Sequence, residues 1–487
     1  MLLLCIGLAP VLLAIVLRLI RSRRAREMCA VIFSFLISGA IGYALFGGGD
    51  GRTELFRLSD HFVCALRLDG AGKIYIGLAA LLWPFSMLYA VEYMRHEERE
   101  GNFFTWYLAA YGAAFFLAAA ENLFTLYIFY ELLTLCTVPL VWHKRDEEST
   151  RAALAYMLYL IGGAALGFVA VVLVPAACGS DGAFRLGGTI TRSLRSYVDP
   201  LYQWIAMLGF LGFGVKAAVL PLSRWLPKAS VAPTPVTALL HAVAVVNAGV
   251  FAVLRVLYYE VPTVYIRGTW VQPVILILSF ATIVYAAAMA VREQHVKRRL
   301  AWSTVSNLSY MLLGLSLLSE QGMAAGLAHM IFHSLTKIIL FFCAGTVLTQ
   351  TGRTQVREMH GLGKKLPLVF LCFTLAGLSL LGVPPLPGFV SKYALVTAAL
   401  SQGSAFAVAG AVSLLLAAVL TAIYIFTVVY PAFFMGFSPL DGESEFAAPG
   451  VCMKVSFVVL SLLLVSAAVF AGPIMNYLTS LAGGVFS

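Results

Sequence analysis

Charged side chains are scarce in this sequence. Asp, Glu, Lys and Arg make up 11% of the 487 residues, and hydrophobic residues make up 61%. An ordinary soluble domain has about 25% charged and about 45–50% apolar residues. Apolar runs of about 20 residues recur from end to end, and each is long enough to cross a bilayer as a helix. The composition excludes a soluble enzyme, a disordered protein and a nucleic-acid-binding protein.

Clustered cysteines and nucleotide-binding loops are also missing. The eight cysteines are too far apart in the sequence to form a CxxC pair, so a zinc ribbon or an iron–sulfur cluster is not expected. The sequence contains neither a GxGxxG after an expected strand nor a phosphate-binding P-loop. We therefore expect that the chain holds no metal and no cofactor, and that energy for transport comes from a partner redox complex or another ion gradient.

Fourteen apolar segments predict an all-α membrane protein of about 14 transmembrane helices. Only helices or closed barrels satisfy backbone groups in lipid, and these runs lack the alternation of barrel strands. The first run has no basic region before it, which indicates a retained span and not a cleaved signal peptide. The expected limits are 2–20, 28–46, 70–93, 103–120, 122–142, 152–176, 201–222, 234–258, 270–291, 299–318, 322–350, 366–400, 405–436 and 452–478.

Basic residues predict how these helices are oriented. Of the 33 Lys and Arg residues, 21 lie in the loops after odd-numbered segments and nine in the loops after even-numbered segments. The positive-inside rule then places the odd-numbered loops in the cytoplasm and both termini on the outer side of the cell inner membrane. Arg24 and Lys297 should face the cytoplasm, and Ser193 and Arg267 should face outward.

Few ionisable residues lie deep inside the expected helices. Each is costly there, so each is a functional candidate. Two purely structural alternatives stay open. His241 taken alone could be a hydrogen-bonded packing residue, and the Lys392 side chain could extend to the membrane–water interface. His329, His333 and Lys337 recur at every fourth position and so share one helix face. The candidates are Glu131, Lys216, His241, His329, His333, Lys337 and Lys392.

Prolines predict two broken helices. Segment seven ends VLPLSRWLPKASVAPTP, and segment twelve contains LLGVPPLPGFVSK. Proline inside a membrane helix frees backbone groups, which must then face protein or water. The breaks lie five segments apart, each beside a lysine, which indicates two inverted five-helix repeats of the kind found in transporters. The expected units are three N-terminal helices in residues 1–102, a first repeat in 103–258, a second repeat in 270–436 and a last helix in 451–487.

Five stretches, taken in chain order, carry a resemblance to a known family. They are FYELLTLCTVPLVW, VKAAVLPLSRWLPKASVAPTPVTALLHAVAVVNAGVF, KRRLAWSTVSNLSYMLLG, LAHMIFHSLTKIILFFCAGTVL and LLGVPPLPGFVSKYALV. Over roughly residues 70–435 the chain resembles the antiporter-like subunits of respiratory complex I, of Mrp-type sodium/proton antiporters and of membrane-bound hydrogenases. The motifs are specific for the superfamily and do not select one complex.

The resemblance implies a role for each candidate residue. Glu131 looks like the glutamate that pairs with Lys216, the lysine of the first broken helix. His241 looks like a relay group on the next helix. The other candidates look like the central histidine and lysine positions and the terminal lysine beside the second break, namely His329, His333, Lys337 and Lys392.

Several positions depart from the family pattern. Ser223 stands where a histidine is common, and WLPKAS replaces WLPDAH, which puts Lys228 and Ser230 in place of an acid and a histidine. Asn247 stands where many members carry a lysine. The first half therefore has fewer titratable groups, and His241 with water would have to cover the gap.

Three classes of function remain open. The chain could be a proton-translocating subunit of a redox-driven complex, a subunit of an Mrp-type antiporter, or a non-pumping scaffold. The intact set of Glu131, Lys216, Lys337 and Lys392 argues against the scaffold. The expected partners are other membrane subunits, including homologous antiporter-like ones, hydrophilic iron–sulfur subunits elsewhere in the complex, and the lipid bilayer, but no nucleic acid.

The candidates also predict a path. We expect a hydrated polar axis from His241 through His333 and Lys337 to Lys392, opening outward near Lys392. Neutral histidine accepts a proton at one ring nitrogen and donates one from the other. Sodium is a hard cation that prefers oxygen ligands, whereas this axis offers mainly nitrogen. Protons are therefore the expected ion.

Overall fold

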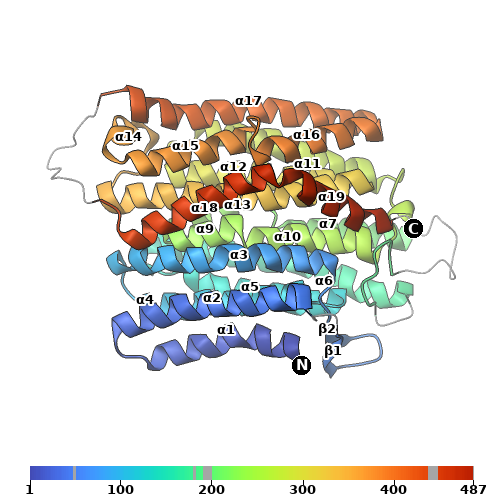
Figure 1. Ribbon diagram of the computed structural model, residues 1–487. Coiled ribbons are helices and arrows are strands. Elements are labelled where there is room, and N and C mark those ends of the chain that lie inside the picture. Colours follow the sequence, from blue (N-terminus) through green and yellow to red (C-terminus); the bar gives the residue numbers. More distant parts are fainter. Residues whose placement is uncertain (48–50, 179–181, 190–199, 437–447, 486–487) are drawn as a thin grey trace.

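Long helices that run side by side make up most of the molecule (Figure 1). The computed structural model describes residues 1–47, 51–178, 182–189, 200–436 and 448–485. The first helices are α1 (Leu2–Leu19), α2 (Arg23–Gly47), α3 (Gly70–Tyr93), α4 (Glu100–Ala118), α5 (Leu123–Val141), α6 (Glu147–Cys178) and α7 (Pro200–Gly214). After them come α8 (Trp225–Lys228), α9 (Thr234–Ala242), α10 (Val245–Leu254), α11 (Val271–Arg292), α12 (Val296–Ser316) and α13 (Glu320–Thr351). The last are α14 (Leu362–Lys365), α15 (Pro367–Leu381), α16 (Pro387–Gln402), α17 (Ala405–Phe434), α18 (Val451–Val469) and α19 (Ala471–Ala482).

Ten helical stretches in the described part of the chain are long and apolar enough to cross a membrane. They include α9 and α10 taken together, but not α4, α12 or the pieces of the broken helices. The molecule is thus a multi-pass helical membrane protein. The count of 14 spans and the inverted repeat remain predictions.

A short hairpin departs from the expected all-α fold. Strands β1 (Thr53–Arg57) and β2 (Val63–Leu66) pair antiparallel, with Thr53 opposite Leu66. All four residues of β2 are buried, whereas β1 is largely exposed. The hairpin occupies a connection that the sequence analysis treated as loop, because neither strand is long enough to show a clear alternation.

Side-chain caps start several of the helices that carry the site. The Asn122 side chain accepts a hydrogen bond from the Thr125 N–H at 2.8 Å and so caps α5. Ser319 caps α13 through the Gly322 N–H at 3.1 Å. Such side chains satisfy backbone donors that the first helical turn leaves free. The beginnings of α5 and α13 are therefore fixed by local sequence.

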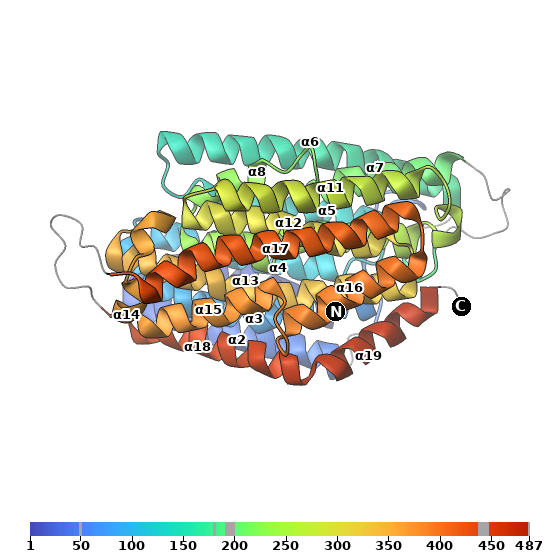
Figure 2. The same cartoon turned by 90° about the horizontal axis from the view of Figure 1, so that it is seen from above.

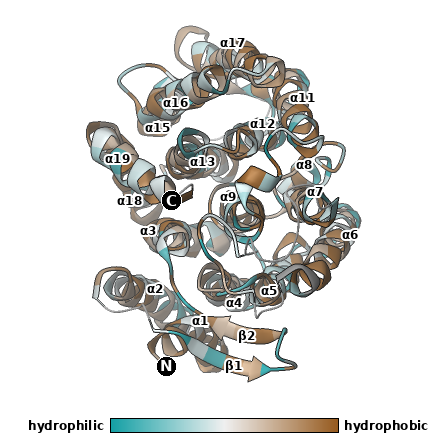
Figure 3. Cartoon of the chain, turned by 90° about the vertical axis from the view of Figure 1, so that its right-hand side faces the viewer, coloured by the Kyte–Doolittle hydropathy of each residue, from teal (hydrophilic) through white to brown (hydrophobic). Residues whose placement is uncertain are grey.

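Helix α13 occupies the middle of the bundle. Seen along the helix axes in Figure 3, it is surrounded by α12, α9, α3, α18 and α16. In its most apolar window 89% of the residues are buried, and in the stretch Thr234–Glu260 all are buried, compared with 28% in α2. Both interior stretches carry candidate site residues, so the polar groups lie inside the protein and not against lipid.

Two helices break where the prolines predict. Between α7 and α8 the chain runs without regular helix through Pro221, and α15 and α16 are separated by Gly382–Leu386, which contains Pro384 and Pro385. A third break was not predicted. The segment expected as one helix over 234–258 is interrupted between Ala242 and Val245, and it continues beyond α10 as a turn of π-helix over Arg255–Glu260.

Candidate functional site

Lys216 lies in the first break, two residues after α7 ends. Its side chain is fully buried, and its ammonium group donates a hydrogen bond to the carbonyl oxygen of Tyr130 on α5. The same nitrogen lies 3.3 Å from the centroid of the Tyr130 ring, where a charged ammonium is attracted by the ring face. Helix α5 therefore holds Lys216 through the residue that precedes Glu131.

Glu131 is close to Lys216 but is not ion-paired with it. The two groups interact electrostatically, yet among the described residues no basic nitrogen lies within 4.0 Å of the Glu131 carboxylate. Its buried Oε1 atom has no hydrogen-bond partner there. Coulomb energy varies inversely with distance, so a small movement of either side chain changes this interaction strongly.

A glycine on α10 lets the first break approach closely. A Cβ atom at Gly249 would lie 2.5 Å from the Ala217 backbone nitrogen and 2.8 Å from the Lys216 Cβ atom. Any larger side chain would push the break away from α10. The backbone that carries Lys216 is thus positioned from two sides, by α5 and by α10.

The unpredicted break between α9 and α10 is stabilised by polar side chains. The Asn247 amide donates to the Ala242 carbonyl oxygen at 3.0 Å and to the Ser334 hydroxyl on α13 at 2.9 Å. The Tyr75 hydroxyl on α3 donates to the Ala244 carbonyl oxygen at 3.0 Å. The Ala244 carbonyl also accepts the Ala248 N–H at 2.9 Å, whereas the Ala242 carbonyl gains its partner from the Asn247 side chain. Asn247 therefore has a structural role that also links the two halves of the chain.

His241 ends α9 next to this break. It is fully buried, and its ring stacks on Phe341 of α13 with centroids 4.9 Å apart. Its Nε2 atom lies 3.5 Å from the Ser230 hydroxyl, while Nδ1 has no partner among the described residues. Ser230 stands where the resemblance implies a histidine. It thus contacts the His241 ring, which would have to replace the missing titratable groups of the first half.

The three residues of the α13 face contact different neighbours. His329 hydrogen-bonds Ser391 of α16 at 3.0 Å and Asn307 of α12 at 3.2 Å, so both of its ring nitrogens are satisfied. Lys337 donates to the Leu300 carbonyl oxygen at 3.0 Å and to the Ser303 hydroxyl. The row therefore runs from α16 at one end to the first turns of α12 at the other.

His333 stands between them with neither ring nitrogen bonded. Its side chain is 3% exposed, and both nitrogens lack a partner in the described part of the chain. Its ring centroid lies 5.9 Å from that of His329. Buried polar atoms are normally satisfied by protein or by ordered water. His333 is thus the member of the row best suited to bind water and to exchange protons with it.

Lys392 lies beside the second break. Its ammonium group donates to the carbonyl oxygens of Leu380 and Leu381, at 2.6 and 3.1 Å, where α15 ends. It also lies 5.3 Å from the centroid of the Tyr310 ring, which contacts His329 in turn. Carbonyls freed by the second break thus accept hydrogen bonds from Lys392, whereas Lys216 donates to a carbonyl of the neighbouring helix α5.

Lys297 is a buried lysine that the sequence analysis placed in a solvent-facing loop. That expectation is wrong about its exposure, which is 6%. The ammonium group donates to the Ala232 carbonyl oxygen, 2.6 Å away, after the first broken helix. Lys297 stands just before the expected apolar segment, where exposed loop lysines are common. The local sequence does not distinguish a buried lysine from an exposed one at this position. Lys297 joins α12 to the first half beneath His241.

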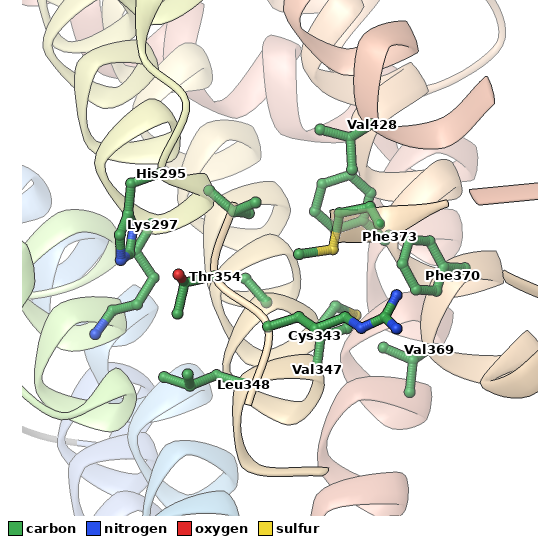
Figure 4. A pocket seen from close by; sticks show the side chains of 14 residues that line it. His295, Lys297, Cys343, Val347, Leu348, Thr354, Val369, Phe370, Phe373 and Val428 are labelled. Carbon is green, nitrogen blue, oxygen red and sulfur yellow. The ribbon is translucent and has the colours of Figure 1, made fainter. Parts of the chain in front are cut away.

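A small cavity lies next to Lys297. It has a volume of about 20 Å³, which is room for about one water molecule. Figure 4 shows the Lys297 side chain extending away from Phe370 and Phe373, which line the opposite side with Val369 and Cys343. The lining is mainly apolar, and the volume is far below the roughly 300–1,000 Å³ of a small-molecule site.

Arg255, near the end of the segment expected over 234–258, is a second buried cation. It is fully buried and forms an ion pair with Asp69, which also caps α3 through the Gly72 N–H at 3.0 Å. The rings of Phe184, Phe251 and Tyr259 surround its guanidinium group. Arg299 is also buried, with 4% of its surface exposed. Ser193, one of the predicted outward positions, lies outside the described residues.

The interior row contains no acid. The charged neighbours of His241, His333 and Lys337 in the described part of the chain are lysines and histidines. Glu131 lies apart, in the first half. The sequence-predicted residues therefore form two groups: Glu131 with Lys216, and a basic row made of His241, His329, His333, Lys337 and Lys392.

The arrangement matches known proteins in sequence and in fold. Residues 120–421 match a family model described as NADH:quinone oxidoreductase/Mrp antiporter, transmembrane. NADH-quinone oxidoreductase subunit N of Desulforudis audaxviator is 32% identical over 432 residues, which cover 86% of this chain and 83% of that protein. Na⁺/H⁺ antiporter subunit A1 of Staphylococcus aureus is 28% identical over 434 residues, which cover 84% of this chain but only 53% of the relative.

The fold is shared with a respiratory membrane complex. A chain in the structure of an archaeal membrane-bound sulfane sulfur reductase superposes with a TM-score of 0.85 at 23% identity, covering 100% of this chain and 97% of that chain. At this identity the likeness concerns the fold. The superposition extends over the length of both chains.

Proposed function

Because the chain belongs to the NADH:quinone oxidoreductase/Mrp antiporter family of membrane subunits, we propose that it translocates protons as an antiporter-like subunit of a redox-driven complex. The complex would be a complex I-like NADH dehydrogenase or a membrane-bound hydrogenase. The observation that carries the proposal is the buried basic row on α13 and its neighbours, with His333 unbonded at its centre. Buried cations inside membrane proteins mark ion paths by default.

The first-half pair supplies a switch of suitable size. At an effective dielectric constant of about 20, two unit charges 4 Å apart attract by about 4 kcal/mol. Moving one charge across 100 mV costs about 2.3 kcal/mol. Bringing Glu131 to Lys216 would therefore hold a proton on the lysine, and separating them would release it. The present geometry, with the lysine on the Tyr130 carbonyl and the carboxylate unpaired, corresponds to the separated arrangement.

An Mrp-type Na⁺/H⁺ antiporter subunit is the second candidate. It is favoured by the antiporter relative, which aligns over 84% of this chain. The side-chain groups of the basic row are nitrogens, which are poor ligands for a hard cation such as sodium. Protons would therefore use this chain in either complex, and sodium, where transported, would use another subunit.

The finer architecture is part of the proposal. We infer 14 spans, with inverted repeats in residues 103–258 and 270–436 flanked by the units 1–102 and 451–487. Both termini lie toward the same end of the bundle (Figure 1), as an even number of crossings requires. The basic loops then place that end on the outer side of the inner membrane.

Partners are expected along α5. Glu131 is only partly buried, and its neighbours Leu132 and Leu135 are 40% and 54% exposed. A carboxylate at a lipid-facing surface is costly, so a neighbouring membrane subunit should cover this face. Iron–sulfur subunits elsewhere in the complex would supply the redox energy.

Lys337→Ala tests the proposal. In the assembled complex reconstituted into vesicles, the variant should lose most proton translocation, because Lys337 links the α13 row to α12. Lys364→Ala, an exposed lysine on α14, is the matched control and should translocate normally. Undiminished translocation by Lys337→Ala would refute the path. Sodium transport that survives in the variant would support the division of labour with another subunit.

A further inference from the structure

A large charged cleft lies on the surface away from the basic row. It has a volume of about 540 Å³ and lies among the first turns of α6, the short helix α8 and the first turns of α12. Figure 2 shows α6 at the outer edge of the bundle, with α8 beneath it. The cleft is therefore on the side of the molecule and near the ends of the helices, where a membrane protein meets lipid headgroups.

Two basic side chains in this cleft are left without a counter-ion. Arg298 pairs with Glu148 at 2.7 Å, and Arg151 pairs with Glu147. Arg224 and Lys228, both exposed, take part in no ion pair within 4.0 Å among the described residues. The cleft thus presents two free cations four residues apart, Arg224 just before α8 and Lys228 at its last position, together with the carboxylate of Glu293, which forms no ion pair among the described residues.

Lys228 also reverses the charge expected at its position. The family pattern has WLPDAH where this chain has WLPKAS. Lys228 thus adds a second cation beside Arg224 where the resemblance would imply an acid.

An exposed apolar stripe continues from the cleft along α6. Leu154, Leu158 and Ile161 are 52%, 63% and 43% exposed, and they follow Arg151 at helical spacings of three and four. From Arg151 to Ile161 the helix rises about 15 Å, which is half the thickness of a hydrocarbon core of about 30 Å. Exposed apolar residues continue along α6 as far as Val172, so the first 15 Å lie at the depth of the acyl chains of one leaflet, with the cations at headgroup depth.

We propose that the cleft binds the phosphate group of an anionic phospholipid. Arg224 and Lys228 hold the phosphate as charge-assisted hydrogen-bond donors, and the acyl chains lie along the apolar stripe of α6. A docked soluble segment would use the cations but not an apolar stripe that lies at the depth of the acyl chains, and a docked transmembrane helix would exclude both labelled lipids in the test below. The combination of free cations and stripe therefore favours lipid.

The test compares lipid retention by matched charge reversals. The purified complex is placed in vesicles of phosphatidylcholine that contain spin-labelled phosphatidylglycerol or spin-labelled phosphatidylcholine, and the immobilised fraction of each is measured. A basic residue near the surface contributes about a five-fold preference for anionic lipid. Lys228→Asp should lower the preference for phosphatidylglycerol by at least that factor, and Lys228→Arg should keep it.

Arg24→Asp is the control, because Arg24 is exposed in the first turn of α2 and does not line the cleft. It should lower the preference by no more than the five-fold factor of a general surface cation, and by less than Lys228→Asp does. Leu158→Asn should weaken retention of both labelled lipids, which a site for free phosphate would not show. The proposal fails if the two charge reversals act equally. It also fails if millimolar inorganic phosphate displaces the lipid while Leu158→Asn has no effect, because the site would then bind free phosphate. A third contradicting result is that the assembled complex immobilises neither labelled lipid, because a neighbouring subunit would then cover the cleft.

Discussion

At the scale of single residues, the two lysines at the breaks share one device. Each donates to backbone carbonyls, Lys216 to Tyr130 within α5 and Lys392 to Leu380 and Leu381 at the end of α15. A carbonyl oxygen accepts a hydrogen bond from lysine but carries no formal charge. The lysines are thus stabilised without being fixed in the charged form by a carboxylate.

The first-half pair leads to a mutational prediction. Lys216→Met should abolish coupled proton transport while the complex still assembles, because the apolar chain fills the same buried space. Glu131→Ala should impair transport, and Glu131→Asp, which keeps the charge, should be milder. The double variant should be no worse than the worse single one, since the groups act as a unit. Additive losses, measured as initial transport rates in vesicles, would contradict the coupling.

Asp69 gives a prediction about stability and pH. Burial alone would raise the pKa of the Asp69 carboxyl, but the Arg255 guanidinium and the Gly72 N–H hold that pKa below its usual value. A depressed pKa means that the carboxylate stabilises the fold above its unfolded pKa of about 4 and that this contribution is lost as pH falls through the folded value.

Asp69→Asn should therefore destabilise the protein by about 3–5 kcal/mol at pH 7, because Arg255 is left buried and unpaired. Asparagine still accepts the Gly72 N–H, so the helix cap is retained and the change isolates the charge. The difference in melting temperature from the natural protein should be constant between pH 7 and pH 5 and should narrow below about pH 4. If the two melting temperatures are equal at pH 7, the ion pair between Asp69 and Arg255 contributes nothing to stability.

Residue types alone predicted the candidate site residues, but they did not predict the burial of every cation. Lys216, His333 and Lys337 were identified because ionisable groups stand out in apolar helices. Lys297 and Arg255 were missed because each lies at the end of an apolar segment, where a cation normally extends into water. Their burial depends on α9 and on the Asp69 turn, which are distant in sequence.

At the scale of helices, proline and glycine made the first and second breaks predictable. The break between α9 and α10 has no such signal, because HAVAVVNAG contains neither proline nor a glycine at the interruption. It is stabilised by Tyr75 of α3 and Ser334 of α13. These are tertiary contacts, and single-sequence patterns do not contain them.

The second break makes a prediction about packing. A Cβ atom at Gly388 would lie 1.8 Å from the Ser379 carbonyl oxygen, so Gly388→Ala should push α16 from α15 and displace Lys392. We expect a loss of about 1–3 kcal/mol of stability together with reduced transport. Gly472→Ala on α19 is the control, because no atom lies within 4 Å of its added Cβ. Normal melting and normal transport of Gly388→Ala would contradict the close packing.

At the scale of the whole molecule, the composition was sufficient to predict a multi-pass helical bundle. It could not predict which helix would be central. Helix α13 resembles its neighbours in hydropathy, yet it lies in the middle (Figure 3). Only the small and polar residues along α13 indicated this, through the stripe of His329, His333 and Lys337.

Orientation is tested by labelling exposed sites at the two ends. Arg24 and Arg267 are both exposed, so single cysteines there suit an impermeant thiol reagent in whole cells, in a background without the natural cysteines. The basic-residue bias predicts labelling at 267 and protection at 24. Lys297 cannot serve, because it is buried. Labelling at 24 with protection at 267 would reverse the orientation.

The absence of acids along the basic row limits how much charge it can store. Neighbouring rings such as His329 and His333 are 5.9 Å apart. Two positive charges at that separation repel by about 2.8 kcal/mol at an effective dielectric constant of about 20, which is a factor of about 100 in occupancy. If protons use the row, His329 and His333 together hold one proton at a time, so a second proton enters this pair only as the first leaves and protons pass it in single file.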